Sequence, residues 1–191
     1  MNLKNSQKTF ETWSKTSFSE RQQLLHKLSE ILLKRKQEFG EIITSEMNKP
    51  ISQAVPEIEK CAAMAEYYSK VENTLQTEKL DTEFAYSEIH HEAMGIILGV
   101  MPWNYPFWQA LRFAVPAILA GNVVIMKHAS ICLKSGDALQ DIFEEAGFPK
   151  GVFTHIKVSH DEIEEILANP LVQGVSLTGS EAAGSAVASA A

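Results

Sequence analysis

The segment GIILGVMPWNYPFWQALRFAVPAILAGNVVIMK, residues 95–127, decides the fold. It contains two short apolar runs, 96–101 and 123–126, separated by a stretch of helical periodicity that ends at Gly121. Short apolar runs without polar alternation are typical of strands buried on both faces. A strand, a helix and a second buried strand predict a right-handed crossover between parallel strands.

The same alternation continues to the end of the chain and predicts an open α/β domain over 95–191. Gly147 and Pro149 close one helical pattern, and Ser159 with Glu162 has the spacing of a capping box before the next. Helices are expected at 135–147, 163–168 and 181–191, and strands at 152–158 and 172–180.

The first half of the chain is helical by periodicity. Ser17 and Glu20 form a second capping-box spacing, which predicts one long amphipathic helix over 17–39. Residues 82–93 alternate instead, with Phe84 and Tyr86 between polar neighbours, and predict a strand with one exposed face. Further helical patterns cover 41–48 and 54–75, and the predicted division is 1–76 (helical), 77–94 (strand) and 95–191 (α/β).

Composition excludes several classes of function. The 191 residues carry a net charge of -7, which disfavours nucleic acids and anionic membranes as partners. Neither a membrane-spanning apolar stretch nor a signal peptide is evident, so we expect a cytoplasmic protein. Cys61 and Cys132 are too few and too far apart for a disulfide framework, and the histidines lack ligand spacing, so we expect no metal.

Polar residues follow three of the predicted strands, where an open parallel sheet binds its ligands. They are Trp103-Asn104, the turn Lys127–Ser130, and Thr178–Ser180 before a helix. A buried lysine requires an anion, and a helix N-terminus binds phosphate, so together these ends indicate a phosphate-bearing cofactor. Asn104 and Ser180 are also good helix caps, and capping alone is the alternative interpretation.

Four motifs resemble the aldehyde dehydrogenase superfamily in order and spacing. They are MPWNYP (101–106), GNVVIMKHAS (121–130), EEAGFPKGVF (144–153) and VSLTGSEAAG (175–184), and SEMNKPISQAVPEI (45–58) is similar as well. The resemblance implies a Rossmann-like nucleotide-binding domain preceded by a helical segment. It also accounts for the absence of a G-x-G-x-x-G signature, which this family lacks.

The resemblance implies that Asn104 stabilises the oxyanion formed when a cysteine thiolate attacks an aldehyde. Hydride then passes to the nicotinamide, and a glutamate-activated water hydrolyses the thioester. Ser130 stands where NAD-preferring members often carry glutamate, so we expect NADP rather than NAD as cofactor. By the same matching, the residues that contact the cofactor are Trp103, Lys127, His128, Ala129, Ser130, Gly179, Ser180 and Gly184.

Arg112 matches the arginine of succinate semialdehyde dehydrogenases, which implies that it binds the carboxylate at the far end of the substrate. With regular helical spacing, Asn104, Trp108 and Arg112 would face one cavity. An exposed or salt-bridged helix arginine is the alternative.

The family's nucleophilic cysteine and general-base glutamate lie beyond Ala191, and neither Cys61 nor Cys132 has the context of the nucleophile. We therefore expect an amino-terminal portion that is inactive alone, whose complete parent oxidises an aldehyde and forms a homo-oligomer through 77–94. Two rivals remain: a non-catalytic cofactor-binding fragment, and a reductase acting on an acyl phosphate or acyl-CoA.

Overall fold

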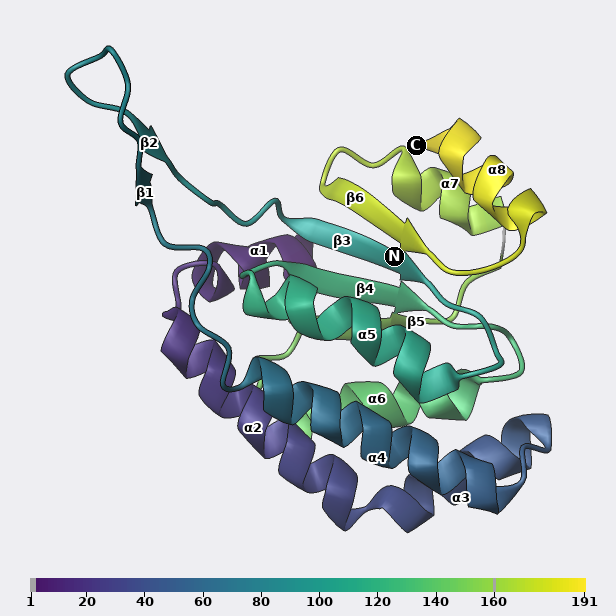
Figure 1. Ribbon diagram of the computed structural model, residues 1–191. Coiled ribbons are helices and arrows are strands. Elements are labelled where there is room, and N and C mark those ends of the chain that lie inside the picture. Colours follow the sequence, from purple (N-terminus) through teal and green to yellow (C-terminus); the bar gives the residue numbers. More distant parts are fainter. Residues whose placement is uncertain (1–2, 160) are drawn as a thin grey trace.

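The computed structural model describes residues 3–159 and 161–191. Its centre is a four-stranded sheet with the strand order β5-β4-β3-β6, and all of its pairings are parallel (Figure 1). This confirms the predicted open α/β fold. The strands are β3 (Ile96–Val100), β4 (Val123–Lys127), β5 (Phe153–Ile156) and β6 (Val172–Leu177).

Helices cover the sheet in layers. Figure 1 shows α5 and α6 between the sheet and an outer layer of α2, α3 and α4, whereas α7 and α8 lie on the other side, above β6 in this view. Helix α1 contacts β3 and β4. The bounds are α1 (Leu3–Trp13), α2 (Phe18–Lys34), α3 (Lys36–Met47), α4 (Ile51–Tyr68), α5 (Pro106–Leu119), α6 (Leu133–Glu145), α7 (Asp161–Leu167) and α8 (Glu181–Ala190).

Close packing of α5 on the sheet follows from its sequence. Phe107, Leu111 and Val115 recur at helical spacing and are all fully buried. Gly99 of β3 lies under this helix, and a Cβ atom there would come within 2.5 Å of the Phe113 ring. A larger residue at 99 would therefore require the Phe113 ring to move from its place between α5 and β3.

The prediction of one continuous helix over 17–39 is wrong, because the structure has two helices there. It divides at Arg35, with α2 ending at Lys34 and α3 starting at Lys36. Both predicted capping boxes are confirmed, because the side chains of Ser17 and Ser159 accept from the backbone N–H groups of residues 20 and 162. The change of direction at Arg35 lets Phe39 of α3 contact Phe107 of α5, their ring centroids 5.5 Å apart.

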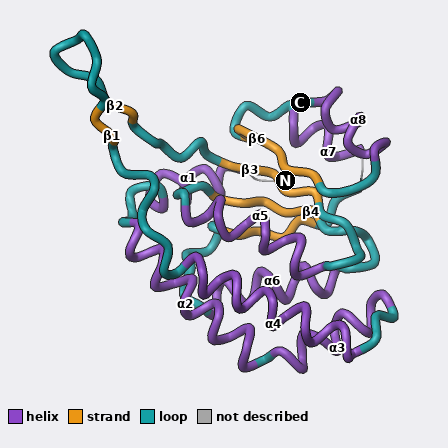
Figure 2. Tube along the Cα trace, in the orientation of Figure 1, coloured by secondary structure: helices purple, strands orange, loops and turns teal. Residues whose placement is uncertain are grey.

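The predicted strand over 82–93 is also wrong over most of its length. Only β1 (Glu78–Lys79) and β2 (Glu88–Ile89) pair, antiparallel, and a loop projects beyond them (Figure 2). Phe84 and Tyr86 are 71% and 72% exposed, so the alternation does not correspond to a buried face. No large part of the described chain packs against this hairpin, and burial therefore cannot enforce a longer ladder.

Helix α1 lies within the predicted helical segment 1–76, although its sparse apolar residues gave no separate helix there. Leu3 and Trp13 are nevertheless buried, and Trp13 Nε1 donates to Ile118 O at 3.3 Å. Among the described helices, none is both long and apolar enough to cross a membrane.

Candidate functional site

Three polar segments leave neighbouring strands at the same edge of the sheet. Val100, at the end of β3, is in register with Lys127 of β4 and Leu177 of β6, so residues 101–104, 128–130 and 178–180 emerge side by side. Two of these segments meet in one hollow, lined by Pro102, Trp103, Asn104, Thr178, Gly179 and Ser180. The structure therefore brings four of the expected site residues together, whereas Lys127, Ser130, Gly184 and Arg112 do not line this hollow.

Asn104 is exposed and does not cap the helix that follows it. Helix α5 begins at Pro106, its N-cap residue is Tyr105, and no side chain of the cap accepts a hydrogen bond. Within the described part of the chain, the Asn104 amide makes no hydrogen bond; only its backbone oxygen does, from Lys49 Nζ at 3.2 Å. The capping interpretation of Asn104 is therefore wrong, and its N–H₂ group is available to a ligand.

A buried ion pair, which the sequence did not reveal, holds the Asn104 segment. Glu57 of α4 accepts from the backbone N–H groups of Phe107 and Trp108 at 2.9 and 3.1 Å, so it caps α5 from another helix. Its second oxygen accepts from Lys49 Nζ at 2.6 Å, and the side chains of Glu57 and Lys49 are only 0% and 7% exposed. The pair thus links the carbonyl of Asn104 to the first turn of α5.

Lys127 is a buried cation without a matching anion. It is 5% exposed, burial lowers its pKa, and it forms no ion pair with any residue that the structure describes. Ser130, at the end of the same turn, is exposed, and no acidic side chain stands in the turn from 127 to 130. The turn therefore offers an ammonium group and a hydroxyl to an anionic ligand.

His128 has no free ring nitrogen to offer a ligand. Its Nε2 lies 2.9 Å from Pro106 O, and its Nδ1 accepts from the Ala129 backbone N–H at 2.9 Å, which fixes the neutral tautomer with the proton on Nε2. Burial lowers the pKa of His128 to about 4. The residue ties the Lys127–Ser130 turn to the start of α5, so the structure gives it a positioning contact.

Ser180 caps α8, as the alternative interpretation held. Its hydroxyl oxygen accepts from the Ala183 backbone N–H at 3.2 Å, while its own proton remains free to be donated. Gly184 lies one turn further, and a Cβ atom there would meet nothing within 4 Å. The space beside Gly184 is therefore open.

Trp108 and Arg112 lie one turn apart on α5, as the regular helical spacing predicts. Asn104 precedes the helix, so the prediction that it shares this spacing is wrong. Trp108 is half-buried beneath Lys60 of α4, whose Nζ is 3.7 Å from the ring centroid. Arg112 is exposed and forms no ion pair with a described residue.

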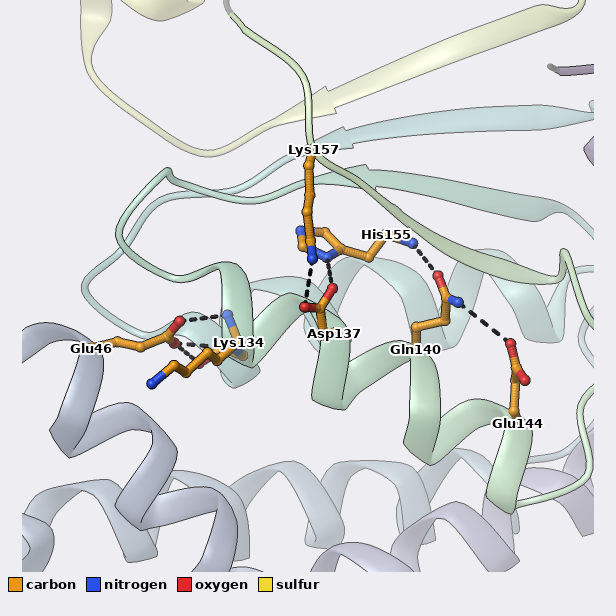
Figure 3. A network of polar contacts seen from close by, with 8 residues as sticks. Glu46, Lys134, Asp137, Gln140, Glu144, His155 and Lys157 are labelled. Atoms are coloured by element: carbon orange, nitrogen blue, oxygen red, sulfur yellow. Dashed lines mark hydrogen bonds and ion pairs between the residues drawn. The ribbon is translucent and has the colours of Figure 1, made fainter. Parts of the chain in front are cut away.

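A second polar cluster lies along α6 and β5 (Figure 3). Asp137 accepts from Lys157 Nζ at 2.7 Å and lies 3.0 Å from His155 Nδ1, while Glu46 accepts from backbone N–H groups at the start of α6. A Cβ atom on Gly136 would come within 2.3 Å of His155 Nε2. Unlike Lys127, His155 and Lys157 both face a carboxylate, that of Asp137, so neither offers an unmatched charge to a ligand.

Neither cysteine is a thiolate at neutral pH. Burial raises the pKa of Cys61 far above its ordinary value, and burial raises that of Cys132 to about 12. Cys132 Sγ donates to Trp103 O at 3.7 Å, so this thiol instead supports the segment before Asn104.

An open parallel sheet whose carboxyl edge carries an unmatched lysine and a helix N-terminus is characteristic of the α/β proteins that bind nucleotides. Comparison with known families makes the assignment specific, because a model described as the aldehyde dehydrogenase family matches residues 1–191. The chain belongs to the aldehyde dehydrogenase family.

Among its relatives is a probable succinate-semialdehyde dehydrogenase (NADP(+)) of Synechocystis, 42% identical over 187 residues, which cover 97% of this chain and 41% of that protein. The succinate-semialdehyde dehydrogenase (NADP(+)) of Deinococcus radiodurans is 35% identical over 97% of this chain and 39% of its own length. The chain therefore spans about two fifths of these relatives.

A similar solved structure is succinic semialdehyde dehydrogenase from Streptococcus pyogenes in complex with NADP+. It superimposes with a TM-score of 0.94 at 33% identity, over 98% of this chain and 42% of that one. The fold described above is thus that of the matching part of an aldehyde dehydrogenase.

Proposed function

We propose that the complete protein oxidises succinate semialdehyde to the dicarboxylate, with NADP preferred over NAD. The observation that carries the proposal is the unmatched Lys127, buried at the end of β4 beside Ser130 and on the same sheet edge as Asn104. The relatives named as NADP(+) succinate-semialdehyde dehydrogenases, and the solved one in complex with NADP+, support it.

The residues of this edge fit a phosphorylated dinucleotide. Lys127 supplies a positive charge that no described carboxylate neutralises, and Ser130 adds a donor where an acidic residue would repel a 2′-phosphate. Trp103, Gly179 and Ser180, which line one hollow, together with Ala129 and Gly184, are the further residues that we expect to contact the dinucleotide. When bound, the cofactor accepts the hydride that leaves the aldehyde carbon.

Asn104 provides the electrostatic part of the reaction. Its free amide N–H₂ donates to the carbonyl oxygen of the aldehyde as negative charge develops there. The Lys49–Glu57 pair holds the carbonyl of this residue and the first N–H groups of α5 after it, so the donor needs little reorganisation during the reaction. The attacking thiolate and the base that activates water belong to the complete protein and are neither Cys61 nor Cys132.

Arg112 and Trp108 form the substrate end of the site. Arg112 pairs with the distal carboxylate of the semialdehyde, and the Trp108 ring packs against the carbon chain between the two functional groups. Because Arg112 forms no ion pair with a described residue, its charge is available for this role.

Steady-state kinetics of the complete enzyme tests the proposal. The wild type is expected to oxidise succinate semialdehyde with a kcat/KM at least tenfold higher for NADP than for NAD. Ser130→Glu should lower kcat/KM with NADP by about tenfold or more, because a carboxylate then opposes the 2′-phosphate, while NAD is little affected. Equal use of both cofactors by the wild type, or equal effects of the substitution, would contradict it.

We also propose that the complete protein is a cytoplasmic homo-oligomer in which the β1–β2 hairpin contacts another subunit. Phe84 and Tyr86, two positions apart in this hairpin, are large and exposed, and exposed aromatic side chains are typical of an interface. Sedimentation of the complete protein should show that replacing both by serine lowers the oligomeric state. An unchanged sedimentation coefficient would count against the hairpin.

A further inference from the structure

We propose that Lys60 is a specificity-determining residue that acts with Arg112 on the carboxylate of the substrate. The proposal rests on the function proposed above and names a second cation for the same substrate group. Lys60 lies on α4, and its Nζ is 3.7 Å from the centroid of the Trp108 ring on α5. Arg112 follows Trp108 by one helical turn, so the two cations flank one aromatic side chain.

The position of Lys60 is fixed by the contact between the two helices. Glu57 precedes Lys60 by about one turn of α4 and accepts from the backbone N–H of Trp108 itself, at 3.1 Å. Rotation of α4 against α5 at this point would break a buried, charge-assisted hydrogen bond. Lys60 is therefore held over the Trp108 ring by the helix that carries it.

The charge of Lys60 is not neutralised by a carboxylate of the described chain. Neither Lys60 nor Arg112 forms an ion pair with a described residue. Neighbouring lysines on α3, on α4 or at their ends do, namely Lys36 with Glu59, Lys49 with Glu57 and Lys70 with Glu66. In a chain of net charge -7, an uncompensated cation over the Trp108 ring and another one helical turn along α5 form a local site for an anion.

Lys49 provides an internal comparison. It also lies over an aromatic ring, with Nζ 3.6 Å from the Tyr105 centroid, but its charge is neutralised by the buried Glu57. Lys49 thus supports the fold, whereas Lys60, in the same kind of contact, keeps its charge for a ligand. Tyr105, under Lys49, directly follows Asn104, whereas Trp108, under Lys60, lies further along α5 toward Arg112.

The two cations have different roles in recognition. The planar guanidinium of Arg112 can form two parallel hydrogen bonds with a carboxylate, which sets its orientation. The ammonium of Lys60 is a point charge on a flexible chain, and it raises affinity for the anion without a strict geometric requirement. Loss of Lys60 should therefore raise the KM for an anionic aldehyde and leave the chemical step unchanged.

The test is the kinetics of the complete enzyme with succinate semialdehyde and with butanal, an aldehyde of equal chain length that lacks the carboxylate. Lys60→Met should raise the KM for succinate semialdehyde by about tenfold, while kcat, and the KM for butanal, change less than about twofold. Lys60→Arg keeps the charge and should restore most of the affinity. Lys27→Met, an exposed lysine of α2 without a described partner, is the matched control and should change neither KM.

The outcomes separate the two proposals. A wild type that prefers succinate semialdehyde, combined with a Lys60→Met variant whose KM is unchanged or rises equally for both aldehydes, overturns the role of Lys60 alone. A wild type with no preference for succinate semialdehyde over butanal refutes the proposed substrate, and the role of Lys60 is then overturned with it. Unchanged thermal unfolding of the variant confirms that any effect is on binding.

Discussion

The two flanks of the central strand β3 differ sharply in how they are supported. On one flank, every residue of β4 is buried, and the Asn104 segment is held by an ion pair inside the protein. On the other, β6 and α8 contain no fully buried residue. The Asn104 segment and the residues after β6 line the same hollow, so the wall that we propose contacts the aldehyde is preorganised by the fold, whereas the Ser180 wall has little support from the described chain.

The largest expected effect on stability comes from removing the buried ion pair on the better supported flank. Glu57→Ala leaves Lys49 buried without its partner and removes the cap of α5, so the free energy of unfolding should fall by about 3–5 kcal/mol. Urea denaturation measures the change. Glu59→Ala on the same helix is the control, because its pair with Lys36 is about half exposed and should contribute less than about 1 kcal/mol. Equal losses would contradict the distinction.

The second largest effect should be a loss of stability on the same flank at acid pH. Because the pKa of His128 is lowered to about 4 in the folded chain from an ordinary 6.5, its contribution to stability is complete above pH 6.5 and is lost as the pH falls toward 4. At about 1.4 kcal/mol per pH unit, the loss amounts to about 3 kcal/mol.

The measurement is denaturant unfolding at pH 7 and pH 4. His155, whose pKa is also lowered by burial, adds to the acid sensitivity, so the informative quantity is the difference between wild type and His128→Gln. The variant should show the flatter pH dependence. If both lose the same stability on acidification, His128 is not the residue that titrates.

A pair of matched truncations compares the flanks directly. Val124 of β4 is fully buried, whereas Val175 of β6 is half-buried. Val124→Ala should cost about 2 kcal/mol of unfolding free energy and Val175→Ala less than about 1 kcal/mol, because less apolar area is lost from the interior. Equal costs would mean that the C-terminal flank is better packed in solution.

The smallest effect is expected at the cap of α8. Ser180→Ala removes the acceptor for the Ala183 backbone N–H and should weaken the helix by about 1 kcal/mol. Hydrogen exchange should therefore accelerate for the amides of α8 and stay unchanged for those of β3 and β4. Faster exchange in β4 as well would show that the two flanks unfold together.

Much of the fold could be predicted from short-range patterns. The continuous apolar runs at 96–101 and 123–126 identified the two central strands, and Gly121 marked the end of the helix between them. Polar residues directly after those strands then identified the edge of the sheet, because parallel strands deliver their carboxyl ends to one place.

The support of the site could not be predicted in the same way. Glu57 and Glu59 are indistinguishable in a helical pattern, yet one is buried under residues 107–108 and the other pairs at the surface. Likewise, nothing local shows that both ring nitrogens of His128 are engaged, since one partner is Pro106, which is distant in sequence. Alternation at 82–93 misled because alternation marks a buried face only where another element covers it.

The hairpin between β1 and β2 is also a natural place to divide the polypeptide. Phe84 and Tyr86 present exposed aromatic side chains on a projecting loop, where a chymotrypsin-type protease cleaves readily. Such a nick would separate α1–α4 from the sheet covalently but not physically, because α4 stays packed on α5 and α2 on α6. The helical half and the sheet half should consequently reassemble when produced as separate chains, which makes this loop a suitable place to split the protein for complementation.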